Sequence, residues 1–171
     1  MNILKKSKLI SILSFLLVVT GLILMFLPQI NAFIIELRTN ENLETVSAIT
    51  AEDLQNNLNS DSSFEFDLID EISASTLAQT SGHIDPRLYV ARLYIPAIEM
   101  NLPVYNGVTN DLLNAGAGTM RPGLTMGTGN FPIAGHYAHT ANVLFADLTE
   151  LEVGDDIYLT DNEHIYEYRG Y

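Results

Sequence analysis

The clearest feature of the hydrophobic pattern is an uninterrupted apolar run near the start of the chain. Residues 9–27 read LISILSFLLVVTGLILMFL and carry no charge. A helix rises about 1.5 Å per residue, so this run is long enough to cross the roughly 30 Å hydrocarbon core of a bilayer. Three lysines precede it within residues 1–8, and the positive-inside rule places this short N-terminus in the cytoplasm. We therefore predict a transmembrane anchor over residues 9–28, with everything after it outside the cell.

A cleaved signal peptide and a buried core helix are the two alternatives for this run. The run is longer than the apolar region of a typical signal peptide, and no clear small-x-small cleavage motif follows it. A helix at the surface of a globular core would show a polar stripe, which is missing here. The retained anchor is therefore the favoured interpretation.

Residues 29–85 follow a polar pattern. Residues 39–82 contain no Lys, Arg or Pro and are rich in Asn, Ser, Thr, Asp and Glu. One short helix is predicted over residues 51–58, with Thr50 as its N-cap and Asp53 at the third helical position. A composition of this kind favours a solvated, acidic extracellular stalk over a folded module.

From residue 86 to residue 171 the pattern indicates short strands. Apolar and β-branched residues predict strands over 88–95, 100–105, 130–135, 156–160 and 164–168, with turns at 96–99 and 161–162. Two short helices are predicted, over 110–115 after Thr109 as N-cap and over 144–151. The glycines of 116–129 predict a loop. Short strands with few helices indicate a mainly β fold of the mixed barrel type.

The overall charge excludes one large class of function. The formal net charge is −13, and all but one of the 21 acidic residues follow Arg38. Such a chain repels phosphate backbones, so we expect no nucleic-acid partner. It has no cysteine, which excludes disulfides and thiolate metal sites within these 171 residues.

The run of residues 115–139, AGAGTMRPGLTMGTGNFPIAGHYAH, holds the candidate chemistry. His136 follows a predicted apolar strand and a glycine, a position typical of a site residue, although a histidine satisfied by a backbone carbonyl would fit too. His139 completes an H-x-x-H pair without a third ligand at a diagnostic spacing, so we expect no metal. Phosphate-loop, dinucleotide and serine-triad motifs are missing. We expect no cofactor, and a calcium requirement stays open because the acids show no EF-hand spacing.

Taken together, these segments resemble the first part of a class A sortase domain. Three features carry the resemblance in order: a strand pair around 95–103, the GAGT segment Gly116–Thr119, and an N-F-x-I-A-G-H strand ending at His136. The resemblance covers residues 88–171, and the anchor and polar stalk match the usual layout of the family. It implies part of an eight-stranded β-barrel on the outer face of the membrane of a Gram-positive bacterium.

Sortases are cysteine transpeptidases that cleave an LPxTG-type sorting signal and pass it to an amine, usually on a peptidoglycan precursor, so that surface proteins become attached to the cell wall. By the resemblance, His136 is the catalytic histidine, a general acid for the departing amine. Ala134 matches a small residue that lines the substrate groove.

The nucleophilic cysteine and the oxyanion-stabilising arginine of the family lie on later strands, which the 171 residues do not contain, and Arg121 and Arg169 match neither. We therefore expect a truncated sortase without transpeptidase activity as given. The alternative is a noncatalytic membrane-tethered protein that binds sorting signals or cell-wall components through a residual sortase-like surface.

Overall fold

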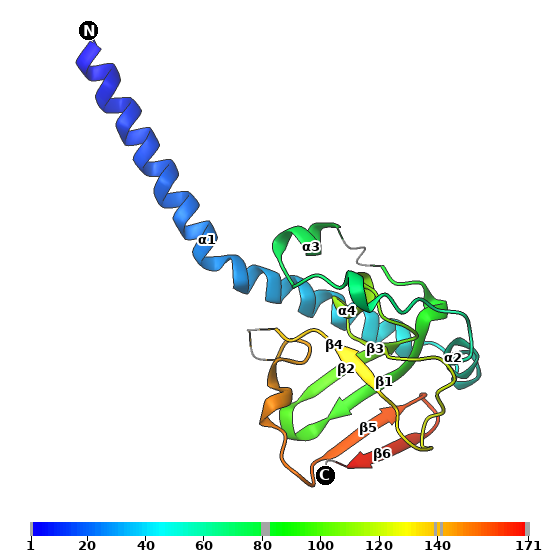
Figure 1. Cartoon of the computed structure of the whole chain (residues 1–171). Helices are drawn as coiled ribbons and strands as arrows, with labels where there is room; N and C mark the ends of the chain where they lie inside the picture. Colours follow the sequence, from blue (N-terminus) through cyan, green and yellow to red (C-terminus); the bar gives the residue numbers. More distant parts are fainter. Residues whose placement is uncertain (1, 80–82, 139, 141, 170–171) are drawn as a thin grey trace.

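The computed structural model describes residues 2–79, 83–138, 140 and 142–169. A long N-terminal helix, α1 (Asn2–Ser47), leads into a small domain built on a six-stranded sheet (Figure 1). The first half of α1 projects away from the domain, whereas its second half lies against it.

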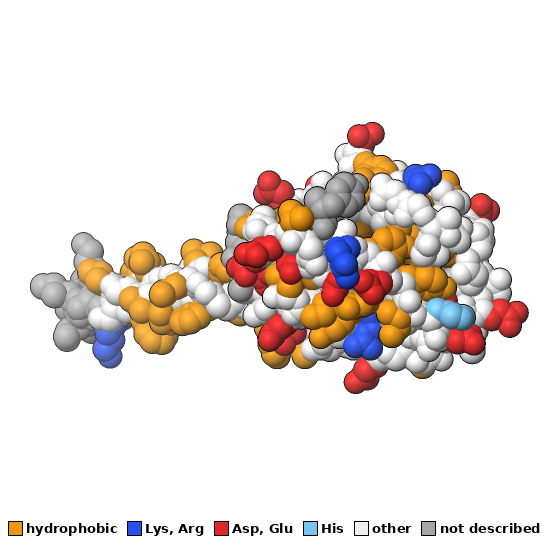
Figure 2. Space-filling model, turned by 90° about the horizontal axis from the view of Figure 1, so that it is seen from below, with side chains coloured by type: hydrophobic (Ala, Val, Ile, Leu, Met, Phe, Trp, Pro, Cys, Tyr) orange, Lys and Arg blue, Asp and Glu red, His pale blue; other side chains and the backbone are white. Residues whose placement is uncertain are grey.

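The predicted anchor, residues 9–28, forms the projecting half of α1. The stretch Lys8–Ser47 is long and apolar enough to cross a membrane, a test that a signal sequence near the N-terminus would also pass. Figure 2 shows apolar side chains gathered around the projecting helix, with acidic side chains scattered over the domain. Pro28 lies inside α1. A proline removes a helical hydrogen bond and bends a helix, and α1 changes direction where it reaches the domain (Figure 1).

The middle segment is folded, in contrast to the solvated stalk that its composition favours. After α1 come α2 (Ala51–Leu58), η1 (Phe66–Leu68), α3 (Ala74–Gln79) and η2 (Pro86–Leu88). Leu54 and Leu58 of α2 and Leu77 of α3 are buried, each with at most 2% of its surface exposed, as are Ile35 and Val46 in the second half of α1. Leu54 and Leu58 are four residues apart and therefore share one face of α2. The polar composition of the segment hides this spacing, which lets α2 dock on β1 of the sheet.

The start of α2 agrees with its prediction. The Thr50 hydroxyl accepts a hydrogen bond from the Asp53 N–H at 3.1 Å, and it donates to the Asp53 carboxylate at 2.7 Å. These bonds satisfy one of the free N–H groups at the helix start and hold the cap in place.

The sheet has the strand order β4-β3-β2-β1-β5-β6. Its strands are β1 (Tyr89–Ile95), β2 (Met100–Tyr105), β3 (Ala117–Thr119), β4 (Ile133–Gly135), β5 (Asp156–Thr160) and β6 (Ile165–Arg169). Neighbours run antiparallel except β2 and β3, which are parallel. The mixed, mainly β architecture is therefore as predicted. Among the described residues, β4 and β6 each pair on one side only.

Two predicted elements differ from the structure. β3 lies inside the glycine-rich stretch that was predicted as loop, because short side chains let it run beside β2. The helix predicted over 144–151 is a short 3₁₀ helix, η4 (Ala146–Glu150). Leu144 has a positive φ of 50° and bridges to Tyr137, so the helix cannot begin there. In contrast, α4 (Asn110–Leu113) begins after its predicted cap, Thr109.

A buried asparagine joins the helical segment to the sheet. Asn106 is 1% exposed, and its Nδ2 donates to the carbonyl oxygens of Asn57 at 2.7 Å and Ser60 at 3.0 Å. Its Oδ1 accepts from the Thr119 hydroxyl at 3.3 Å, and that hydroxyl accepts from the Gly107 N–H at 2.9 Å. This network ties the end of α2 to β3, the neighbour of β4.

Candidate active site

His136 directly follows β4, one of the two edge strands of the described sheet. β4 pairs with β3 through Ala134 opposite Gly118 and Gly135 opposite Ala117. A Cβ on Gly118 would collide with the carbonyl oxygen of Gly107, so only a glycine lets β3 lie this close to the core. The GAGT segment therefore determines how closely β3, and with it β4 and His136, approaches the chain at Gly107.

The residue before His136 is a glycine for a packing reason. A Cβ on Gly135 would lie 2.7 Å from the Phe145 ring, closer than real side chains approach. The ring packs on the glycine backbone, while the Phe145 N–H donates to the His136 carbonyl oxygen at 3.1 Å. Tyr137 and Leu144 form the next bridge. The chain after β4 thus folds back on itself and fixes the backbone at His136.

The imidazole of His136 is half-buried, and its Nε2 is buried without a hydrogen-bond partner among the described residues. Burial lowers the pKa of His136 below its ordinary 6.5, because desolvation disfavours the charged ring. The side chain is therefore neutral near pH 7. No backbone carbonyl of the described residues accepts a hydrogen bond from Nε2, so the alternative of a histidine satisfied in this way does not hold at that atom. An imidazole in this state is ready to exchange a proton with a bound group.

A cavity of about 650 Å³ opens beside this imidazole. Its volume is within the range typical of small-molecule sites, about 300–1,000 Å³. One wall is the middle of α1, a second is the segment before α3, and the third is the chain that follows β4. The lining residues are Leu24, Leu27, Pro28, Asn31, Ala32, Ile35, Glu71, Ile72, His136, Tyr137, Ala138, Thr140 and Val143.

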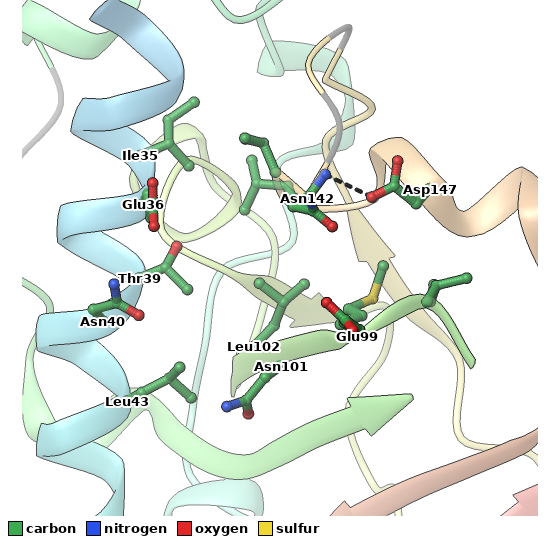
Figure 3. A pocket seen from close by; sticks show the side chains of 14 residues that line it. Ile35, Glu36, Thr39, Asn40, Leu43, Glu99, Asn101, Leu102, Asn142 and Asp147 are labelled. Carbon is green, nitrogen blue, oxygen red and sulfur yellow. Dashed lines mark hydrogen bonds between the residues drawn. The ribbon is translucent and has the colours of Figure 1, made fainter. Parts of the chain in front are cut away.

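A second, smaller cavity of about 180 Å³ adjoins the first, because Ile35 and Val143 line both. Figure 3 shows Glu36 and Asn40 of α1 on one side and Glu99 and Asn101 on the other. The Asp147 carboxylate accepts a hydrogen bond from the Asn142 N–H at 2.6 Å. The described residues that line this cavity include carboxylates and amides but no histidine, so the candidate proton chemistry belongs to the larger one.

The other residues singled out by the sequence are spread over the domain. Ala134 is half-buried on β4 and lies outside the lining of the larger cavity, so its role in a substrate groove stays a prediction. The Arg169 guanidinium pairs with the carboxylates of Asp156 at 3.1 Å and Glu167 at 2.9 Å, at the far edge of the sheet. Arg121 is exposed. His139 lies outside the described residues, so the H-x-x-H pair is not described. Within the described ranges, no group of three or more His, Asp or Glu is placed to hold a metal ion.

Sequence reasoning missed two walls of the larger cavity, the middle of α1 and the segment before α3. The signal was present in α1, where lining residues recur at helical spacing from Leu24 through Leu27, Pro28, Asn31 and Ala32 to Ile35. Reading the apolar run as ending at residue 27 separated Ala32 and Ile35 from it. Glu71 and Ile72 carry no comparable local pattern.

Comparison with known proteins finds similarities over most of the chain. Residues 93–171 match the family model described as the sortase domain. The chain is 33% identical over 156 residues to "Sortase A" of Listeria monocytogenes, covering 91% of this chain and 69% of that protein. It is also 33% identical over 164 residues to "Sortase A" of Bacillus anthracis, covering 95% and 74%. Among solved structures, sortase C-3 of Streptococcus pneumoniae superposes with a TM-score of 0.53 at 25% identity, covering 77% of this chain and 68% of that one.

Proposed function

Because the chain belongs to the sortase family, we propose that it is the membrane-anchored, histidine-bearing part of a class A transpeptidase. The observation that carries this proposal is His136 itself. It follows edge strand β4, its Nε2 has no hydrogen-bond partner among the described residues, and its side chain lines a cavity large enough for a peptide segment or an amine. The similarity to two sortase A proteins supports the class.

In the proposed reaction, His136 moves the protons and a thiolate forms the acyl-enzyme. No cysteine occurs in the 171 residues, so the thiolate and the family's arginine would come from strands paired to the free edge of β4. A thiolate close to the ring would favour its protonated form and oppose the effect of burial on the His136 pKa. The imidazolium would then protonate the departing amine.

The proposed substrates are an LPxTG-type sorting signal and an amine on a peptidoglycan precursor. The proposed location is the outer face of the cytoplasmic membrane of a Gram-positive cell, with α1 as the single anchor. The candidate span in α1 and the sortase A relatives support this location.

A noncatalytic function is the second candidate, and the cavity beside His136 favours it, because a binding site needs no nucleophile. In that case the 171-residue chain would bind sorting signals or cell-wall components through the cavity beside His136. The two candidates differ in one testable respect, which is whether supplying the missing strands creates a working enzyme.

The test is to fuse the C-terminal strands of a class A sortase to this chain and to measure cleavage of a fluorogenic LPxTG peptide. We expect cleavage by the fusion, and neither cleavage nor thiol labelling by the 171-residue chain. His136→Ala should lower turnover of the fusion by about 10²–10⁴, the range for loss of an acid–base group. His139→Ala should have a much smaller effect.

A soluble, folded fusion without cleavage would argue for the noncatalytic function. Loss of activity in His139→Ala with retention in His136→Ala would show that the histidine is wrongly assigned.

A further inference from the structure

We propose that Glu71 and the apolar wall beside it form the subsite that receives the resolving amine in its ammonium form. This inference rests on the proposed function and names the acceptor side of the same site. It assigns a positioning role to a residue that lies outside the part of the chain matching the sortase family model.

The cavity beside His136 has a simple distribution of charge. Among the described residues, its lining contains one carboxylate, that of Glu71, and neither Lys nor Arg. The other walls are mostly aliphatic, with Asn31 and Thr140 as small polar groups. A ligand that enters therefore meets a single negative charge in an apolar setting. This is complementary to a primary ammonium group carried on an apolar or neutral stem, and unfavourable for a carboxylate.

The wall that carries Glu71 is fixed in place. The Thr76 hydroxyl donates to the Glu71 carbonyl oxygen at 3.2 Å at the start of α3. Leu77 is 2% exposed, and the Arg38 guanidinium of α1 donates to its carbonyl oxygen at 3.0 Å. Ile72 packs against the main core. Glu71 is therefore presented by an ordered segment, which lowers the entropic cost of using it to orient a ligand.

The chemistry of the second half-reaction calls for such a subsite. The ammonium first loses one proton to water, and the neutral amine then attacks the thioester carbon. As the C–N bond forms, the C–S bond breaks, the sulfur leaves as a thiolate, and the second amine proton moves to the His136 ring. His136 must be neutral to accept this proton, and its side chain lines the same cavity as Glu71. Glu71 raises the local concentration of the amine, and His136 takes its proton.

Binding to the 171-residue chain in detergent micelles tests the subsite without any turnover. The probe is glycinamide, a primary ammonium without a carboxylate, and N-acetylglycinamide is its neutral counterpart. Nuclear magnetic resonance should show glycinamide perturbing the His136 ring and the Ile72 methyl groups, whereas the neutral analogue should not. Because Glu71 is exposed, Glu71→Gln should weaken glycinamide binding by roughly two- to five-fold, the range for an exposed ion pair. The difference should vanish near ~1 M salt.

The matched control is Asp67→Asn, which removes one exposed carboxylate from the same segment and lies outside the cavity lining. It should bind glycinamide as the unmodified chain does. Equal binding of glycinamide by Glu71→Gln, or equal binding of the acetylated analogue by the unmodified chain, would overturn the inference.

The fusion described above separates this inference from the proposed function. In it, Glu71→Gln should lower the ratio of aminolysis to hydrolysis of the LPxTG peptide by roughly two- to five-fold at subsaturating glycinamide. Asp67→Asn should leave that ratio unchanged. A fusion that forms no acyl-enzyme refutes the proposed function, and the binding measurement then decides the role of Glu71 alone. A fusion that cleaves with the same ratio in Glu71→Gln refutes the inference and leaves the proposed function standing.

Discussion

Replacing Gly135 with alanine should test how tightly the backbone at His136 is packed. The added Cβ would lie 2.7–2.9 Å from three carbons of the Phe145 ring, including Cγ, the ring carbon bonded to the Phe145 Cβ. The ring cannot move by rotating its far end alone, so the strand, the ring or both must shift. Overpacking of this kind costs about 1–3 kcal/mol. For a chain of this length, that corresponds to a fall in melting temperature of about 2–4 °C per kcal/mol.

Near-ultraviolet circular dichroism in micelles would report the unfolding, because seven of the eight tyrosines lie in the described part of the domain and none lies in α1. The decisive comparison is a double-mutant cycle. In a Phe145→Ala background the space beside Gly135 is empty, and Gly135→Ala should then cost much less than in the unmodified chain. A cost that persists unchanged in that background would refute the argument, since the collision with the ring could not be its cause.

Three further predictions concern the site, the buried network and the membrane. Lowering the pH from about 7.5 to about 5.5 should destabilise the unmodified chain more than His136→Gln. The reason is that burial lowers the His136 pKa, so the folded state binds fewer protons than the unfolded state. The stability of the unmodified chain therefore falls as the pH drops through 6.5 and levels off below the folded pKa. Thermal melts of both proteins check this, and an equal loss of melting temperature in the two would contradict it. Asn106→Ala should lower the free energy of unfolding by about 2–4 kcal/mol, because it leaves buried carbonyl and hydroxyl groups unpaired. Asn110→Ala, whose hydrogen bonds to residues 68 and 70 are exposed, should lower it by less than half as much in denaturant titrations. Equal losses of stability would refute the role of burial. Protease added to intact protoplasts should digest the chain after Arg38, and protection of that region would refute the proposed topology.

The parts of the fold that were predictable from the sequence are those governed by local chemistry. Thr50 and Thr109 cap helices because a hydroxyl at that position satisfies a free N–H. The hairpin of β5 and β6 follows from alternation and from Asn162, which adopts a positive φ of 73°. The position of His136 directly after a strand was predictable from the apolar run that precedes it, whereas its catalytic role stays a prediction.

The remainder depends on contacts between distant segments. The docking of α2 and α3 rests on a few apolar residues in a polar sequence, and the approach of Glu71 to the cavity of His136 joins residues that lie far apart along the chain. Leu144 was misassigned to a helix because its pairing with Tyr137 overrides its local spacing. No pattern within one window of sequence contains this information.

The continuity of α1 has a consequence for how partners would be found. At about 1.5 Å per residue, its 46 residues form a rod of roughly 70 Å whose second half is bound to the domain. A flexible linker as long as residues 29–85 would have a root-mean-square end-to-end distance of roughly 40 Å, so the distance of its domain from the membrane would vary over that range. If α1 spans a membrane as proposed, the domain is instead held at a fixed distance from the membrane surface, and Leu24 and Leu27 of the apolar run form part of the cavity wall. Encounters would then be governed by two-dimensional diffusion along the bilayer, and partners free in solution would be captured far less efficiently than partners held in the same plane.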